Sequence, residues 1–196
     1  MRSRSQRGAA LVEAALVLPL MVLLLVGILE FGLLFTSYST TTASTRSGAR
    51  IAATRYATAT NATLKLQEAD RSAASASADL QVLNNATPVG MVLYRVATAS
   101  TGAPAGGFPG ANMSGGCTSN CIRYSWNAST QTMTRTGGTW AAPDACGFTV
   151  DSVGVFVQSR HDFITGVFGA QRYVGAHTVM RLEPLPTDQC SGESPT

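Results

Sequence analysis

The feature that most constrains this chain is an apolar run from Ala9 to Phe35, which reads AALVEAALVLPLMVLLLVGILEFGLLF. Crossing the roughly 30 Å hydrocarbon core of a bilayer takes about 20 helical residues at 1.5 Å each. The run is long enough to cross. It also continues well past the length of a cleavable secretory signal, which would end in a small-residue processing site. The sequence therefore predicts a transmembrane helix over residues 9–35 that stays attached to the rest of the chain.

The positive charge of the chain is concentrated ahead of this run. Arg2, Arg4 and Arg7 account for the formal net charge of +3, so the rest of the chain is neutral. Arginines on one flank and an uncharged stretch at residues 37–45 on the other predict a single-pass protein of the cytoplasmic (inner) membrane, with its N-terminus inside and its C-terminus outside. A neutral remainder lacks the basic patch that nucleic-acid binding requires, so we exclude that class.

Two carboxylates, Glu13 and Glu30, lie within the apolar run. An unpaired acid near the centre of a bilayer costs roughly 2.5–3.5 kcal/mol on insertion scales, so each needs a partner or a place near an interface. Glu30 is close to the outer end, where snorkelling, partial protonation and contact with a neighbouring helix all remain open. Glu13 could complement the dipole at the N-terminus of the helix. Pro19 should bend the helix.

The residues around Glu13 resemble the type IV pilin signal, and more closely the TadE-like pseudopilins of tight-adherence pilus systems. The resemblance rests on a basic leader that ends in Gly8, a small residue at Ala9, Glu13 as the fifth residue after Gly8, and GILEFG at Gly27 to Gly32. SGARIAA at residues 47–53 and HDFITGVFG and TVMRLEP near the C-terminus add to it. The likeness covers the first 55 or so residues well, the last 40 moderately, and the middle only in its strand pattern.

The resemblance implies two roles for residues of the leader region. A membrane-embedded prepilin peptidase would cut between Gly8 and Ala9, leaving the hydrophobic helix attached to the mature chain. Glu13 would then meet the new α-amino group of a neighbouring subunit, so that two charges in lipid neutralise each other and set the axial register.

Beyond the membrane segment, the sequence predicts an α+β fold. Residues 36–61 lack proline and should extend the first helix as a stalk, and a stripe of apolar and small side chains from Leu66 to Leu83 predicts a second, amphipathic helix that lies on the strands after it. A small antiparallel sheet should follow. The expected strands are Val89 to Val96, Ile122 to Trp126, Gln131 to Thr136, Phe148 to Gln158 and His177 to Leu182.

Turn and loop residues complete this organisation. Asn127 to Thr130 should form a hairpin turn, and the stretch from Thr98 to Ser119, rich in glycine and proline, should be a surface loop or mobile connector. We expect a basic leader at residues 1–8, the transmembrane helix at 9–35, the stalk at 36–61 and an extracytoplasmic head at 62–196.

The four cysteines, Cys117, Cys121, Cys146 and Cys190, all lie outside the predicted membrane helix. An even number in an oxidising compartment predicts two disulfides, of which three pairings are possible. We favour Cys117 with Cys121, which share a short loop, and Cys146 with Cys190, which would pin the C-terminal tail. Zinc-finger spacing is missing, so we expect no metal site.

No constellation of residues indicates catalysis. His161 and Asp162 adjoin, but neighbours in a strand point to opposite faces, and no nucleophile motif accompanies them. We interpret the two as a hydrated loop pair and expect no catalytic residues and no cofactor.

Taken together, the residues and the resemblance favour a non-catalytic minor pilin or pseudopilin of a tight-adherence type pilus. Its partners would be a prepilin peptidase, other pilin-like subunits, the pilus assembly machinery and the lipid bilayer, and it could also reach the pilus or the cell surface. The alternative is an uncleaved, single-pass, membrane-tethered extracytoplasmic binding module.

Overall fold

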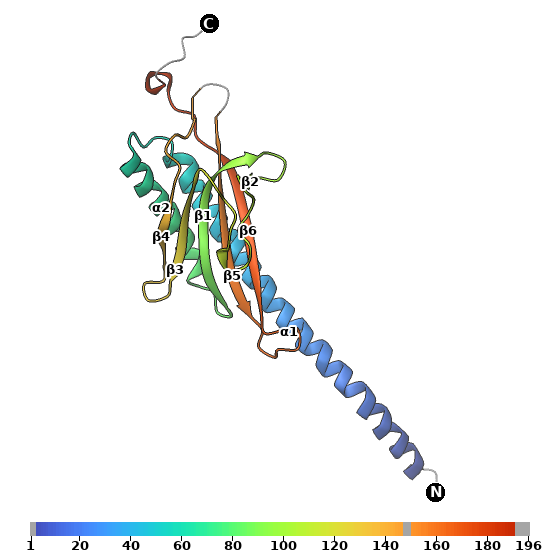
Figure 1. The fold of residues 1–196 in the computed structure, drawn as a ribbon. Helices are drawn as coiled ribbons and strands as arrows, with labels where there is room; N and C mark the ends of the chain where they lie inside the picture. Colours follow the sequence, from blue (N-terminus) through green and yellow to red (C-terminus); the bar gives the residue numbers. More distant parts are fainter. Residues whose placement is uncertain (1–2, 147–149, 191–196) are drawn as a thin grey trace.

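A long helix projects from one end of a head built from helices and a sheet, as Figure 1 shows for this computed structural model. The structure describes residues 3–146 and 150–190. Helix α1 (Ser3–Arg55) is 53 residues long and continues through Pro19. Helix α2 (Ala62–Leu80) follows, and the chain then turns to strands. The predicted order of a long apolar helix, a second helix and a small antiparallel sheet is confirmed.

All the strands in the described residues belong to one antiparallel sheet, ordered β4-β3-β1-β5-β6, with the short β2 paired to the end of β1. Central β1 places Met91 between Tyr124 of β3 and Val157 of β5. The strands are β1 (Ala86–Thr98), β2 (Ala103–Pro104), β3 (Cys121–Asn127), β4 (Thr132–Thr139), β5 (Ser152–Asp162) and β6 (Gln171–Arg181). Two 3-10 turns, Ala111–Met113 and Thr187–Gln189, complete the elements.

The strand ends differ from the sequence prediction more than the strands themselves. β6 begins at Gln171, six residues before the predicted start at His177, and it pairs with β5 along its whole length, from Asp162 opposite Gln171 to Ser152 opposite Arg181. Gly175 and the polar residues at the start of the strand interrupt the hydrophobic alternation, so the sequence pattern did not predict this part of β6. The strand predicted from Phe148 is observed as β5, although residues 148–149 lie outside the described residues.

The main core lies between one face of the sheet and the two helices. Alternate strand residues such as Leu93 and Val155 point toward Ala52 of α1 and Ala76 of α2, and all four are fully buried. Tyr56, just after α1, stacks on Trp140 with ring centroids 5.0 Å apart and donates a hydrogen bond from its hydroxyl to the Trp140 carbonyl. The second half of α1 is therefore packed along the head and does not stand clear of it.

Helix α2 lies closest to α1 at Gly48. The Ser72 hydroxyl donates to the Gly48 carbonyl at 2.8 Å, and a Cβ added at Gly48 would stand 3.3 Å from both the Ala76 Cβ and the Ser72 carbonyl oxygen. The predicted stripe is buried from Ala69 to Leu80, and its ends Leu66 and Leu83, the latter beyond the end of α2, are partly buried. The surface on which α2 lies differs from the prediction, because α1 supplies much of that surface. The sheet supplies the rest, through contacts such as the Met133 N–H donating to the Ser77 hydroxyl.

The glycine-rich stretch after β1 covers the other face of the sheet. Phe108 packs against Tyr94 and Phe156, with centroids 6.0 and 5.4 Å away, and also against His177. Cys117 and Cys121 are buried in the same small cluster. This segment lies at the surface, as predicted, but it is a packed cover for the sheet and not a mobile connector. The predicted hairpin turn after Asn127 joins β3 to β4, with the Asn127 side-chain oxygen accepting the Ser129 N–H at 3.0 Å.

Candidate functional site

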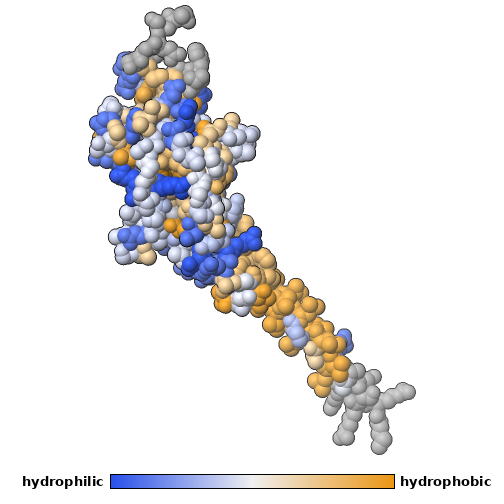
Figure 2. All heavy atoms as spheres, in the orientation of Figure 1, coloured by the Kyte–Doolittle hydropathy of each residue, from blue (hydrophilic) through white to orange (hydrophobic). Residues whose placement is uncertain are grey.

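The half of α1 that projects from the head is an apolar rod whose sides the chain leaves largely uncovered. Most of its large side chains are between 46% and 74% exposed, from Val17 to Leu16, and Val26, Leu33 and Leu34 are half-buried. Figure 2 shows this rod as a mainly hydrophobic surface, in contrast to the mixed hydrophilic and hydrophobic surface of the head. Removing apolar surface from water is worth about 25 cal/mol per Å². An exposed apolar surface of this extent indicates that lipid or another protein covers it.

The length of the rod suits a bilayer. Helix α1 contains a segment that is long and apolar enough to cross a membrane, and none of its most apolar window is buried. Ala10 to Phe35 covers about 39 Å at 1.5 Å per residue, which exceeds the roughly 30 Å hydrocarbon core. The rod is therefore suited to anchoring the protein in a membrane, with its last two turns reaching the interface.

The structure gives the two carboxylates of this rod different surroundings. Glu13 lies on the exposed part of α1, and no hydrogen bond or ion pair to it is found among residues 3–146 and 150–190. Gly8 is also exposed, whereas the side chain of Ala9 lies outside what the structure describes. Glu13 is thus free to meet a group from another molecule.

Glu30, which we expected near lipid or a neighbouring helix, is instead held by its own chain. It is only 2% exposed. Its carboxylate accepts hydrogen bonds from the Thr165 N–H at 2.6 Å, the Thr165 hydroxyl at 2.8 Å and the Ile164 N–H at 3.3 Å. These donors come from the loop between β5 and β6, so the head supplies hydrogen-bond partners for Glu30.

His161 lies near Glu30, at the junction where α1 leaves the head, and is fully buried at the end of β5. Its Nδ1 is 3.0 Å from the Ser37 hydroxyl of α1, and its ring packs edge-on against Phe163. Asp162 faces away and pairs with Arg160. The expected hydrated loop pair is therefore wrong for His161, because α1 offers a hydroxyl partner that allows the ring to be buried.

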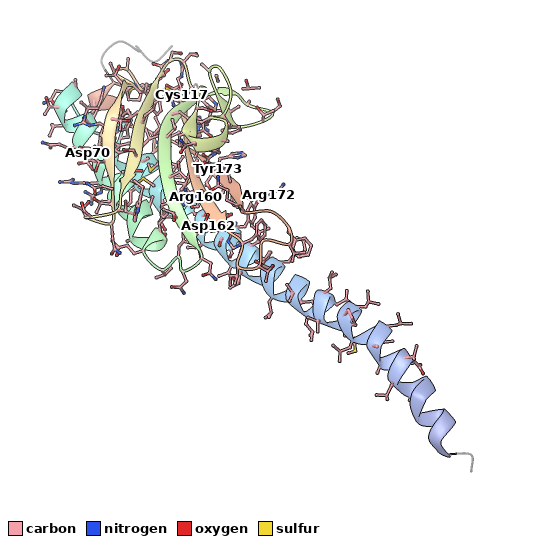
Figure 3. All side chains as sticks on the ribbon, turned by 60° about the horizontal axis from the view of Figure 1, so that its bottom comes forward. Asp70, Cys117, Arg160, Asp162, Arg172 and Tyr173 are labelled. Carbon is pink, nitrogen blue, oxygen red and sulfur yellow. A yellow bond between two sulfur atoms is a disulfide. The ribbon has the colours of Figure 1, made fainter. Side chains whose placement is uncertain are left out.

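An open groove of about 840 Å³ runs beside this junction, between α1 and β6. Its apolar wall comes from α1, and Arg172 and Tyr173 of β6 form its opposite rim. Figure 3 shows these two side chains close to the point where the helix leaves the head. The α1 residues on the wall are Ile28, Phe31, Gly32, Leu34, Phe35 and Tyr38.

The cysteines lie away from this junction. Cys117 bonds to Cys121, and Cys146 bonds to Cys190, which is the pairing that the sequence favoured. In the described parts of the chain, no group of three or more His, Cys, Asp or Glu side chains could hold a metal ion.

Sequence reasoning missed the β5–β6 loop as a part of this site. The sequence suggests HDFITGVFG only as part of the family resemblance, although four apolar residues in so short a link between two polar strand ends are a signal in themselves. Only the fold brings this loop to α1.

Comparison with models of protein families gives a match over part of α1. The family described as TadE-like protein matches residues 8–50, which comprise the exposed rod and most of the packed half of α1. Comparisons with curated proteins and with solved structures give no significant match.

Proposed function

We propose, from the premise that residues 8–50 form a TadE-like segment, that this chain is a non-catalytic pilin-like subunit, a minor pilin or pseudopilin, of a tight-adherence type pilus. The observation that carries the proposal is the uncovered apolar rod with its free carboxylate at Glu13. A rod of this kind can be stored in lipid and can also pack against the rods of other subunits.

The rod would first lie in the cytoplasmic membrane as a single span, with the arginines of the leader inside and the head outside. A prepilin peptidase would cut between Gly8 and Ala9 and create a new α-amino group. Ala9 is four residues before Glu13, about 6 Å along the helix. A stagger of about one turn between two rods would therefore bring the amino group of one subunit to Glu13 of the next.

Such a pairing neutralises two charges in lipid at the same time. An unpaired carboxylate or ammonium is costly within a bilayer, so neighbouring rods gain most when they align at the register that joins the two charges. The pairing would draw the chain into a fibre or its initiating tip, alongside other pilin-like subunits and the assembly machinery.

The fate of the leader tests this proposal against the uncleaved binding module. The full chain is expressed in membranes together with a prepilin peptidase, and its intact mass is measured. We expect loss of residues 1–8. Gly8→Leu, which puts a bulky side chain at the cut, should keep the leader, and Leu11→Ala serves as the matched control that should lose it. A parental chain that still begins with Met1 would favour the tethered module.

The role of Glu13 is tested separately, in membranes that carry the assembly machinery. Glu13→Ala and the uncharged but similarly shaped Glu13→Gln should both insert normally, and both should enter fibres less than the parental chain by roughly tenfold or more. Normal incorporation of both variants would rule out pairing of charges as the role of Glu13.

A further inference from the structure

The loop between β5 and β6, residues 163–170, holds the projecting rod at Glu30 and Phe31. The Phe163 N–H donates to the Ala170 carbonyl at its base, and the loop then turns beside α1. The Phe168 ring packs on Phe31 with centroids 5.1 Å apart, and Glu30 accepts the hydrogen bonds of Ile164 and Thr165. The loop is thus fixed at the level of one turn of α1.

The outward surface of this loop is apolar. Ile164 is 69% exposed, Val167 is 60% exposed and Phe168 is 42% exposed. Phe168 packs on Phe31 and would lie 3.6 Å from a Cβ added at Gly27, so the apolar surface of the rod continues onto the loop. An exposed apolar tip on a hairpin is unfavourable in water and indicates a partner.

The depth of the loop along α1 identifies this partner. Phe31 follows Ala10 by 21 residues, about 32 Å of helix, so a rod that enters the hydrocarbon near Ala10 leaves it near Phe31. Polar groups begin immediately on the head side of the loop. Arg172 stands on the rim of the groove, and no ion pair to it is found in the part of the chain that the structure describes. Figure 3 shows Arg160, Asp162 and Arg172 gathered there.

We propose that the β5–β6 loop is a membrane foot: Ile164, Val167 and Phe168 enter the outer interface of the bilayer, and Arg172 faces the phosphates of the lipids. Glu30 acts as the latch that holds the foot against α1 at this depth. The foot rests on the proposed membrane location of α1 and adds a second point of contact. A head held by two points cannot swing freely about the helix, so its orientation toward other subunits is set before assembly.

The small area of the exposed apolar tip favours a bilayer over a protein as its partner. The three side chains are too few for a stable protein interface, which buries about 800 Å² on each partner, but they are enough to dip a hairpin tip into lipid that already surrounds α1. Aromatic and aliphatic tips with a basic residue above them are typical of surfaces that lie in the headgroup region.

Quenching by brominated lipids tests the foot in the full chain. The protein is reconstituted in vesicles of phosphatidylethanolamine and phosphatidylglycerol whose acyl chains carry bromine close to the headgroups. Val167→Trp reports on the foot, and Leu64→Trp, at the start of α2 in the distant part of the head, is the control. The fluorescence of the parental chain, with its native Trp126 and Trp140, is subtracted. We expect severalfold stronger quenching for Val167→Trp than for Leu64→Trp.

A third position separates failure of the foot from failure of the membrane location. Leu20→Trp, in the middle of the exposed rod, must be quenched by lipids brominated deep in the chains if α1 spans the bilayer. Quenching at position 20 with none beyond the control at position 167 would overturn the foot alone, and would leave the loop to contact a second copy of the chain. No quenching at position 20 would overturn the proposed membrane location itself.

The latch is tested by adding Glu30→Ala to the Val167→Trp chain. Loss of the carboxylate should free the loop and lower the quenching at position 167, and Glu13→Ala in the same chain should leave it unchanged. Quenching that persists in the Glu30→Ala chain would overturn the latch. A circular dichroism spectrum equal to that of the parental chain shows that the head has remained folded.

Discussion

The two halves of α1 share one backbone but have opposite surroundings. From Ala10 to Phe35 most of the side chains are apolar and exposed, whereas from Thr36 to Arg55 the inward side chains are small and fully buried, as at Thr41, Thr45 and Ala49. Lipid is fluid and accepts any apolar shape, but a folded sheet and a second helix approach closely only where side chains are small. Side-chain size therefore indicates which medium each half is built for.

The halves also reach helical structure by different routes. Leucine favours helix intrinsically, while serine and threonine do so poorly. In the packed half their hydroxyls donate to carbonyls three or four residues earlier, as Thr41 does to Ser37 and Ser44 to Thr41. Contacts with the sheet, such as Thr45 with Thr178 at 2.8 Å, then hold the helix in place. The packed half depends on the head, and the exposed half does not.

A charge introduced by substitution should produce the largest difference in unfolding free energy between the two halves of α1. Ala52 is fully buried in the core, so Ala52→Asp should lower the free energy of unfolding of the head by about 3–5 kcal/mol. The measurement is denaturant unfolding in detergent micelles, followed by the fluorescence of the buried Trp140. Leu18→Asp, on the exposed half, is the control and should reduce bilayer insertion without changing this free energy. Equal destabilisation by both would show that the halves are not independent.

Removal of the longer disulfide should affect the packed half next most strongly. Cys146–Cys190 spans 44 residues and holds the tail whose Glu183 N–H donates to the Ala53 carbonyl of α1. The double variant Cys146→Ser, Cys190→Ser should lose about 3–4 kcal/mol of unfolding free energy in the chain-entropy model.

The short disulfide provides the control for that experiment. Cys117–Cys121 spans only four residues, so its removal should cost about 2 kcal/mol by the same model. Denaturant unfolding under oxidising conditions measures both losses. A larger loss for the short loop would show that its packing against the second face of the sheet, and not chain entropy, decides its contribution.

Substitutions at Gly48, in the packed half of α1, and at Gly32, in the exposed half, should differ in their effect on stability, by less than the changes above. Gly48→Leu forces a side chain into the contact with Ser72 and Ala76 and should lower the unfolding free energy by about 1–3 kcal/mol. Gly32→Leu is the matched control, because nothing lies within 4 Å of a Cβ added there. Thermal unfolding in micelles compares the two. A Gly48→Leu protein as stable as the control would place α2 elsewhere.

The smallest expected effect concerns alkaline pH. Burial raises the pKa of Tyr56 well above its ordinary value, so the folded protein keeps the phenol proton after the unfolded chain loses it near pH 10. The resulting stability is complete below about pH 10 and is lost as the pH rises further. Tyr56→Phe removes this dependence, so between pH 10 and 11 it should lose about 1 kcal/mol less unfolding free energy than the parental chain.

Tyr94 provides a second test of this cause. Burial also raises the pKa of Tyr94, so Tyr94→Phe should flatten the alkaline slope of the unfolding free energy in the same direction. Parallel denaturant titrations at pH 9, 10 and 11 in micelles give the slopes. If neither Tyr56→Phe nor Tyr94→Phe flattened the slope, burial would not be the cause.

Regular patterns made much of the fold predictable. The apolar run, the stripe from Leu66 and the alternation around Tyr124 each repeat with the period of the element that they form. The prediction failed where the sequence shows no hydrophobic periodicity. The first half of β6 is held by pairing with β5, and the glycine-rich cover is held by Phe108, a single aromatic in a segment that otherwise looks mobile.

The candidate site divides in the same way. Glu13 stands out because a carboxylate in an apolar run is costly wherever the chain folds, and nothing in the described structure compensates it. Glu30 has the same local signal, yet its partners are the backbone N–H groups of Ile164 and Thr165, more than 130 positions away in the sequence. Backbone donors have no residue-type signature, so no pattern could have named them.

The sequence by itself determined that this protein has an apolar rod, a basic N-terminal segment that accounts for the net charge and an α+β head, because periodicity, charge and length act locally along the chain. Only the tertiary structure decided which half of the rod is covered, that Glu30 is satisfied from within, and that the β5–β6 loop meets α1 beside Phe31. Those outcomes depend on antiparallel pairing that brings distant residues together, and pairing of that kind leaves no trace in neighbouring residues.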